Sequence, residues 1–112
     1  MTRRSDSFRG RWRIVETDMW DQDALDLIEP AEISFGSQQR GELRMIAMGA
    51  GLDYRVTEKA GQPRVEFSWS GVDEGDPVCG RGFAERDGDR IVGRLFIHDG
   101  DESSFVANRI GS

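Results

Sequence analysis

Apolar and polar residues alternate in short stretches along most of this chain. In the first stretch Phe8, Trp12 and Ile14 alternate with arginines, and seven similar stretches follow at regular spacing, the last over residues 105–109. A period of two is typical of a strand that buries one face. Evenly spaced short strands are typical of a sandwich or barrel. The pattern predicts eight strands, with Trp12 on the inner face of the first.

Residues 18–29 depart from this period. Asp18 or Asp21 can cap the start of a helix there, and Pro30 stops its continuation. We expect one short amphipathic helix between the first two strands, packed as a lid over an open end or edge of the sheet. Its apolar stripe is Trp20, Ala24, Leu27 and Ile28, and its polar face is Asp21, Asp23 and Asp26.

Turn signals divide the remaining strands. Gly49-Ala50-Gly51 predicts the connection between the third and fourth strands, residues 60–63 predict the next turn, and an acidic loop at 72–77 precedes the sixth strand. Asp-Gly pairs at 87–88 and 99–100 predict the last two hairpins. The predicted fold is all-β: an eight-stranded antiparallel up-and-down barrel with one short helix between strands one and two.

Two orientations are open for the sixth and seventh strands. Arg81 and Arg94 would need an acidic partner or an anionic ligand if they faced inward, because unpaired buried charge is very costly. A two-residue turn at 87–88 would also place them directly opposite each other, an unfavourable pairing of like charges. We therefore favour the other face as the inner one, with Gly80, Gly82, Ala84, Ile91, Gly93 and Leu95.

Length and composition predict one globular domain. The chain has 112 residues, enough for a single core, and 37% of them are hydrophobic. Residues 1–7 are polar and basic, and we expect them to be disordered. Residues 8–112 form the predicted β-barrel domain.

Charge and cysteine content indicate which class of partner and which cellular compartment to expect. A net charge of -6 argues against a nucleic-acid partner. Cys79 is the single cysteine, so no intrachain disulfide forms, and no apolar run resembles a signal peptide or a membrane span. We expect a cytoplasmic protein with no cofactor and no membrane contact. A closed sheet leaves little free edge, which predicts a monomer or weak dimer.

Gly10-x-Trp12 on the first strand and Arg109 on the last resemble the signature of the lipocalins and the wider calycin group. In that family the final arginine covers the first-strand tryptophan, so the resemblance implies a cation-π contact between Arg109 and Trp12. The chain lacks the family's second and third motifs and its disulfides, so no ligand is carried over. Residues 20–27 and 67–77 are also similar to small uncharacterised bacterial proteins, a resemblance that implies no activity.

No residue pattern predicts a reaction. His98 adjoins a Gly-containing turn, where an exposed histidine is ordinary, and we interpret Cys79 as a small buried residue. The sequence has no phosphate loop and no metal-ligand cluster at standard spacing. We therefore assign no catalytic or metal-binding residue, and an enzyme is the least favoured class.

Two function classes remain. The first is a binding module that encloses a small apolar or amphipathic molecule. Its predicted ligand-binding residues are Trp12, Met45, Tyr54 and Trp69 as walls, Trp20 in the lid, and Arg81 and Arg94 for an anionic group if they face inward. The alternative is a protein-interaction or structural module with a solid core, which presents its acidic loop and lid helix to an unknown protein partner. A cavity would separate them, since an eight-stranded barrel is just wide enough for its side chains or one small ligand.

Overall fold

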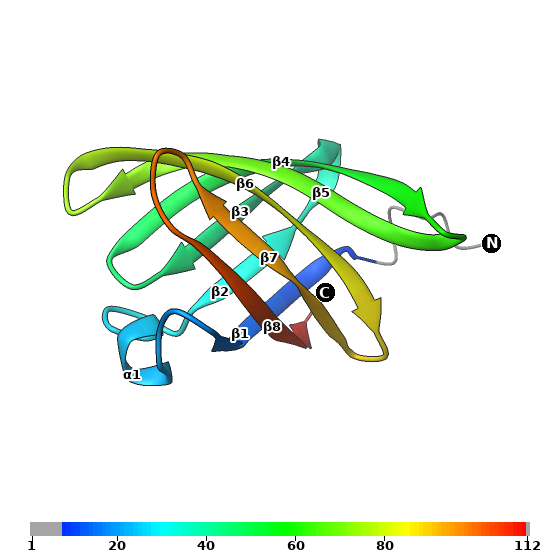
Figure 1. The fold of residues 1–112 in the computed structure, drawn as a ribbon, viewed down its shortest axis with the longest axis horizontal. Coiled ribbons are helices and arrows are strands. Elements are labelled where there is room, and N and C mark those ends of the chain that lie inside the picture. Colours follow the sequence, from blue (N-terminus) through cyan, green and yellow to red (C-terminus); the bar gives the residue numbers. More distant parts are fainter. Residues whose placement is uncertain (1–7, 112) are drawn as a thin grey trace.

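The eight strands of the computed structural model, which describes residues 8–111, close into one antiparallel barrel (Figure 1). Each strand pairs with the next in sequence, and the last pairs with the first, so the predicted up-and-down barrel is confirmed. The expected disorder of residues 1–7 falls outside the described residues. The elements are β1 (Gly10–Thr17), α1 (Gln22–Leu25), β2 (Glu32–Phe35), the 3-10 turn η2 (Ser37–Gln39), β3 (Arg40–Met45), β4 (Met48–Lys59), β5 (Gln62–Asp73), β6 (Asp76–Asp87), β7 (Arg90–Ile97) and β8 (Glu102–Gly111).

Two-residue turns set the register of the long central strands. Ala60-Gly61 joins β4 to β5 with φ of 53° and 81°, and Glu74-Gly75 joins β5 to β6 with φ of 52° and 89°. Turns with two left-handed residues match the natural twist of paired strands. The predicted acidic loop at 72–77 is therefore mostly strand, with two residues in the turn itself.

The turn between β3 and β4 lies at Ile46-Ala47, not at the predicted Gly49-Ala50-Gly51, which lies inside β4. Ile46 takes φ of 58°, which is unusual for a β-branched residue. Its N–H donates to the Leu25 carbonyl at 2.8 Å, and its side chain packs against the core. Contacts with the helical segment therefore hold a turn that the local sequence does not signal.

The small-residue face of β6 and β7 points inward, as favoured from the sequence. A Cβ atom at Gly80 would lie 2.5 Å from Cζ2 of Trp69, so glycine makes room for a large ring on the neighbouring strand. The turn lies at 88–89 rather than 87–88, so Arg81 pairs with Phe96, and Arg94 pairs with Phe83. The predicted Arg81–Arg94 pair is wrong, but a register change of two residues keeps every side chain on its expected face.

Aromatic side chains pack against one another inside the barrel. The Phe35 ring meets the Tyr54 ring edge-on at 5.0 Å between centroids, and the Phe67 ring at 5.9 Å. Edge-to-face packing at such separations is favourable for aromatic rings. The largest side chains with less than 2% exposure are Trp12, Phe8, Phe35, Phe105, Ile14, Leu25, Ile33, Leu43, Ile91 and Val65.

The helix is shorter than predicted and buries a different residue. α1 holds four residues, with Asp21 as its N-cap accepting from the Ala24 N–H at 2.9 Å. Leu25 is its buried side chain, whereas Leu27 and Ile28, expected to face the core, are 58% and 69% exposed. The chain leaves the helix at Asp26, so residues beyond it no longer follow the helical period.

Asp26 itself points back to the barrel, contrary to its predicted place on the solvent face. Its carboxylate accepts from the Ala31 N–H, from Arg13 and from the Gln22 amide at 2.7, 2.7 and 2.9 Å. These bonds tie both sides of the connection to the start of β2 and to β1. They explain why the segment curls at this residue instead of continuing as a helix.

Candidate functional site

The apolar residues predicted to form the walls of an internal ligand site are core residues. Trp12, Met45, Tyr54 and Trp69 are between 0% and 3% exposed, and Trp20 is partly buried against the same cluster. Five grooves of about 320–620 Å³ on the described residues all open to solvent, and none is lined by Trp12, Trp20, Met45 or Tyr54. A ligand-binding role for these residues stays a prediction.

Arg81 and Arg94 lie on the outer wall, so the condition attached to their predicted role, an inward orientation, is not met. Arg94 Nε lies 3.5 Å from a carboxylate oxygen of Glu102. The guanidinium carbon of Arg81 lies 4.4 Å from the centroid of the Phe96 ring. Both arginines therefore belong to the surface of the barrel.

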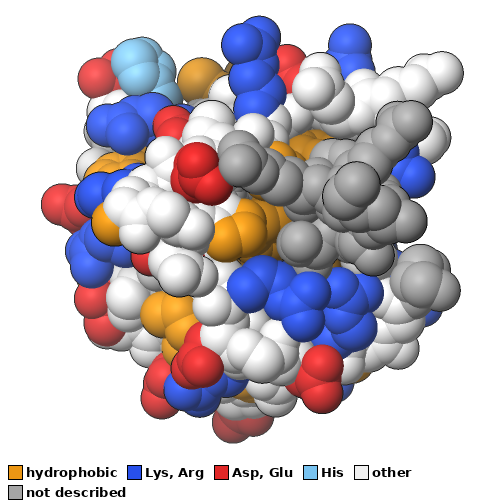
Figure 2. Space-filling view, turned by 90° about the vertical axis from the view of Figure 1, so that its right-hand side faces the viewer, with side chains coloured by type: hydrophobic (Ala, Val, Ile, Leu, Met, Phe, Trp, Pro, Cys, Tyr) orange, Lys and Arg blue, Asp and Glu red, His pale blue; other side chains and the backbone are white. Residues whose placement is uncertain are grey.

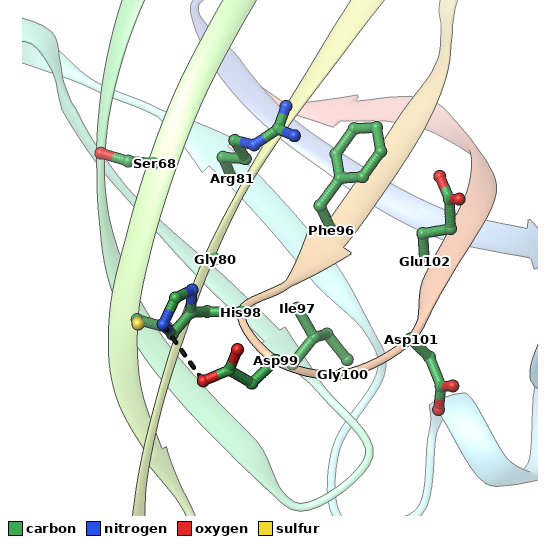
Figure 3. Close-up of a pocket in the computed structure, with 11 residues that line it drawn as sticks. Ser68, Gly80, Arg81, Phe96, Ile97, His98, Asp99, Gly100, Asp101 and Glu102 are labelled. Carbon is green, nitrogen blue, oxygen red and sulfur yellow. Dashed lines mark ion pairs between the residues drawn. The ribbon is translucent and has the colours of Figure 1, made fainter.

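An open groove of about 590 Å³ lies beside Arg81, between β5, β6 and the β7–β8 loop (Figure 3). We call it the Arg81 groove. Figure 3 shows Arg81 and Phe96 at one end and the His98–Asp99 ion pair at the other. Its lining residues are Ser68, Cys79, Gly80, Arg81, Phe96, Ile97, His98, Asp99, Gly100, Asp101 and Glu102.

Backbone hydrogen bonds hold the loop that forms one wall of the Arg81 groove. The His98 N–H donates to the Cys79 carbonyl at 2.8 Å, and the Ile97 N–H donates to the Asp101 carbonyl at 2.9 Å. Asp99 takes φ of 57° and is the first residue of the Asp-Gly pair that predicted this turn from the sequence. The Cys79 thiol is exposed rather than buried, because Cys79 shares the outer face with Arg81.

A second groove of about 550 Å³ shares Ser68 and Arg81 with the first. Here the guanidinium carbon of Arg64 lies 3.7 Å from the centroid of the Phe83 ring, and that ring lies 6.2 Å from the ring of Phe96. We call Arg64, Phe83, Arg81 and Phe96 the arginine–phenylalanine strip. Sequence reasoning missed it, although Arg81-x-Phe83 and Arg94-x-Phe96 show arginine and phenylalanine on one strand face.

One end of the barrel is strongly acidic. The connections at this end, residues 18–31, 46–47, 73–76 and 98–102, contain no lysine or arginine (Figure 1). We call it the acidic end. Its carboxylates are Asp18, Asp21, Asp23, Asp26, Glu29, Asp73, Glu74, Asp76, Asp99, Asp101 and Glu102. Figure 2 looks onto the opposite end, where Lys and Arg side chains gather beside an apolar area.

Exposed apolar side chains lie among the carboxylates of the acidic end. Met19, Leu27 and Ile28 are 45%, 58% and 69% exposed, and Val72 next to Asp73 is 52% exposed. Exposed large hydrophobics away from this end are Val92 and Ile110 among the described residues. The acidic end therefore combines charge with apolar contact area.

Two carboxylates of this end are fixed by hydrogen bonds. A hydrogen bond from the Ser103 hydroxyl lowers the pKa of Asp18, the Ser104 N–H adds to the effect, and desolvation opposes it. Desolvation also opposes the shift at Asp26, but hydrogen bonds from Ala31, Gln22 and Arg13 outweigh it and hold the pKa of Asp26 below its ordinary value.

Comparison of the chain with protein-family models, curated proteins and solved structures finds no match. The closed eight-stranded barrel is compatible with a lipocalin-like fold, and the resemblance to lipocalins goes no further than this architecture. Within residues 8–111, no group of three or more His, Cys, Asp or Glu side chains could hold a metal ion. No helix in the same range is long and apolar enough to cross a membrane.

Proposed function

We propose that this protein is an interaction module that works from its outer surface and docks a basic, partly apolar segment of a protein partner at its acidic end. The observation that carries the proposal is the exposure of Met19, Leu27 and Ile28 on connections that hold eleven carboxylates and no lysine or arginine. Arginines of the neighbouring strands pair with three of these carboxylates, Asp26, Glu29 and Glu102, and the excess of negative charge remains. Apolar side chains give a partner contact area, and the surrounding negative charge selects and steers a basic one.

The segment that would meet the partner is held in place by the barrel. The Ile14 N–H donates to the Ala31 carbonyl at 2.9 Å, and the Thr17 hydroxyl donates to the Trp20 carbonyl at 2.6 Å. The Ile46 N–H and the Asp26 carboxylate anchor the middle of the segment. A surface held in its binding conformation has less entropy to lose on association, which favours affinity.

An internal small-molecule site is supported less well. In its favour, Trp69 Nε1 is buried and has no acceptor among the described residues. One unpaired donor fits an ordered water as well as a ligand. The packed rings of Phe35, Tyr54 and Phe67 occupy part of the interior where an apolar ligand would lie. We therefore place the function on the surface.

We also propose a cytoplasmic setting and a monomeric or weakly dimeric state. The exposed thiol of Cys79, the chain's one cysteine, suits a reducing compartment. The sheet is closed, so it offers no continuous edge for strand-to-strand assembly. A mass measurement that gave a large obligate oligomer would contradict the second proposal.

A labelled amphipathic peptide of lysine and leucine tests the docking proposal, with affinity measured by fluorescence anisotropy. The double variant Leu27→Ser/Ile28→Ser should bind it about ten-fold more weakly than the unaltered protein, since buried apolar anchors carry most of the binding energy of an interface. Val92→Ser is the matched control, because Val92 is 40% exposed on the barrel wall. Added salt should weaken binding.

Two results would contradict the docking proposal. One is equal affinity of the double variant and the Val92→Ser control. The other is equal binding of a peptide in which every lysine is replaced by glutamate, because an acidic surface must discriminate against an acidic partner.

A further inference from the structure

We propose that the outer wall carries a second binding site, in which the arginine–phenylalanine strip binds a small planar molecule bearing a carboxylate or phosphate group. This site lies on β5, β6 and β7 and is independent of the docking surface at the acidic end. Its four residues come from three neighbouring strands, and the two grooves described above meet at Arg81.

Within residues 8–111, no carboxylate neutralises the guanidinium groups of Arg64 and Arg81. No carboxylate of the described residues lies within 4.0 Å of either group, although the chain contains 21 acidic residues. Four other arginines of the wall are paired: Arg11 with Glu32, Arg13 with Asp26, Arg44 with Glu29 and Arg94 with Glu102. Arg40 and Arg55, like Arg64 and Arg81, have no carboxylate of the described residues within 4.0 Å. Arg64 and Arg81 lie over phenylalanine rings instead, which leaves their charge available to an anion.

The phenylalanine rings orient the two guanidinium groups. A ring beneath a guanidinium fixes its plane, so less side-chain entropy is lost when its N–H groups bind an oxyanion. Arg81 is exposed, and its guanidinium carbon is 4.4 Å from the Phe96 centroid, so its outer face is open to a second planar group. A planar ligand can therefore stack on Arg81 while its anionic group accepts hydrogen bonds from a neighbouring guanidinium edge.

The size and polarity of the two grooves also suit such a ligand. The two grooves of about 590 and 550 Å³ are each of the size of a small-molecule site. Ser68 lines both and brings a hydroxyl group to their shared wall, and Arg55 adds a further cation to the second groove. Asp53 and Glu66 also line that groove, and their carboxylates would repel an anion. The anionic group of the ligand must therefore lie on the Arg81 side of the groove.

Titration with two probes tests this site. Adenosine monophosphate supplies a planar base with a phosphate, and salicylate supplies a planar ring with a carboxylate. Amide chemical shifts of the folded protein report the binding position. Tryptophan fluorescence, to which Trp12, Trp20 and Trp69 all contribute, gives a second signal of binding through Trp69, whose ring lies against Gly80 next to Arg81. Saturation by adenosine monophosphate alone identifies phosphate as the anionic group, and saturation by salicylate alone identifies carboxylate.

Matched variants make the test decisive. Arg81→Gln and Phe96→Leu should each weaken binding of the effective probe about ten-fold, because one removes a charged hydrogen bond and the other removes the ring that orients it. Arg94→Gln is the control, since Arg94 lies on the same wall but is paired with Glu102. Uncharged adenosine should bind more weakly than its phosphate.

The proposal is overturned if neither probe saturates by about 10 mM, which is weaker than ordinary specific binding. It is also overturned if Arg81→Gln and Arg94→Gln bind alike. Either result leaves the docking proposal intact, because Leu27 and Ile28 lie in the α1 connection and not on this wall.

Discussion

The guanidinium carbon of Arg109 lies 4.3 Å from the centroid of the Trp12 ring, at the seam where β8 pairs with β1. Trp12 Nε1 donates to the Phe8 carbonyl at 2.8 Å, and Arg109 Nη1 donates to the Arg9 carbonyl at 2.8 Å. The two side chains thus hold the segment that enters β1 against the last strand. The arrangement confirms the predicted burial of Trp12 and its closure by Arg109.

Replacing Trp12 with alanine should destabilise the protein by about 3–5 kcal/mol, the usual cost of emptying a large aromatic site. Arg109→Ala should cost less, about 0.5–2 kcal/mol for the cation-π contact, because it leaves the indole in place. Urea unfolding measures both free energies. A Trp12→Ala change within experimental error would show that the seam contributes little to stability.

Gly80→Ala should be strongly destabilising, because its Cβ would lie 2.0 Å from the Phe96 carbonyl oxygen and 2.5 Å from the Trp69 ring. Overpacking of this kind typically costs about 1–3 kcal/mol. Gly49→Ala is the control, since nothing lies within 4 Å of the Cβ position there. Thermal unfolding of the two variants should separate them clearly, and similar midpoints would contradict the close approach of Gly80 to its neighbours.

Ala60→Asn should stabilise the protein by about 0.4–1 kcal/mol, because Asn-Gly suits a turn with two left-handed residues and alanine does not. Ala60 takes φ of 53° and precedes Gly61 at 81°. The side chain is exposed, so no packing changes with the substitution. Ala60→Val should move the unfolding midpoint in the opposite direction, and a lower midpoint for Ala60→Asn would count against this turn geometry.

Acid should weaken the attachment of the α1 connection. The folded-state pKa of Asp26 lies below its ordinary value, so its contribution to stability is present above an unfolded pKa of about 3.9 and is lost as pH falls through the folded pKa. The same sign holds for Asp18. Asp26→Asn should therefore lower stability at pH 7 and reduce its loss in acid. Denaturant unfolding at a series of pH values checks this, with Asp23→Asn as the charge-removal control.

Strand order and inner face were predictable because they depend on local alternation. The inward orientation of Gly82, Ala84 and Leu95 follows from the alternation along each strand. This alternation gives the correct face even though the predicted turn was misplaced by one residue. The α1 connection was not predictable to the same degree. The apolar spacing of Leu27 and Ile28 favours a helix, but the hydrogen bonds of Asp26 to distant backbone and side-chain groups end it.

The surface sites were hardest to predict because they depend on register between strands. Arg64 meets Phe83 and Arg81 meets Phe96 through cross-strand packing that a single stretch of sequence does not encode. The turn at Ile46 was missed for a related reason, since the group that holds it is the carbonyl of Leu25, far from it in sequence. Trp20 is partly buried against the core, which is compatible with the predicted lid position, and its role as a ligand contact stays a prediction.

The way the barrel closes has a consequence for the order in which it folds. β4, β5 and β6 pair as successive hairpins through two-residue turns, whereas β1 finds β8 only after almost the whole chain has been brought together. Contacts between residues close in sequence require less loop closure, so the β4–β6 meander should form early and the Trp12–Arg109 seam late. Ala60→Asn should then accelerate refolding, while Arg109→Ala should mainly accelerate unfolding.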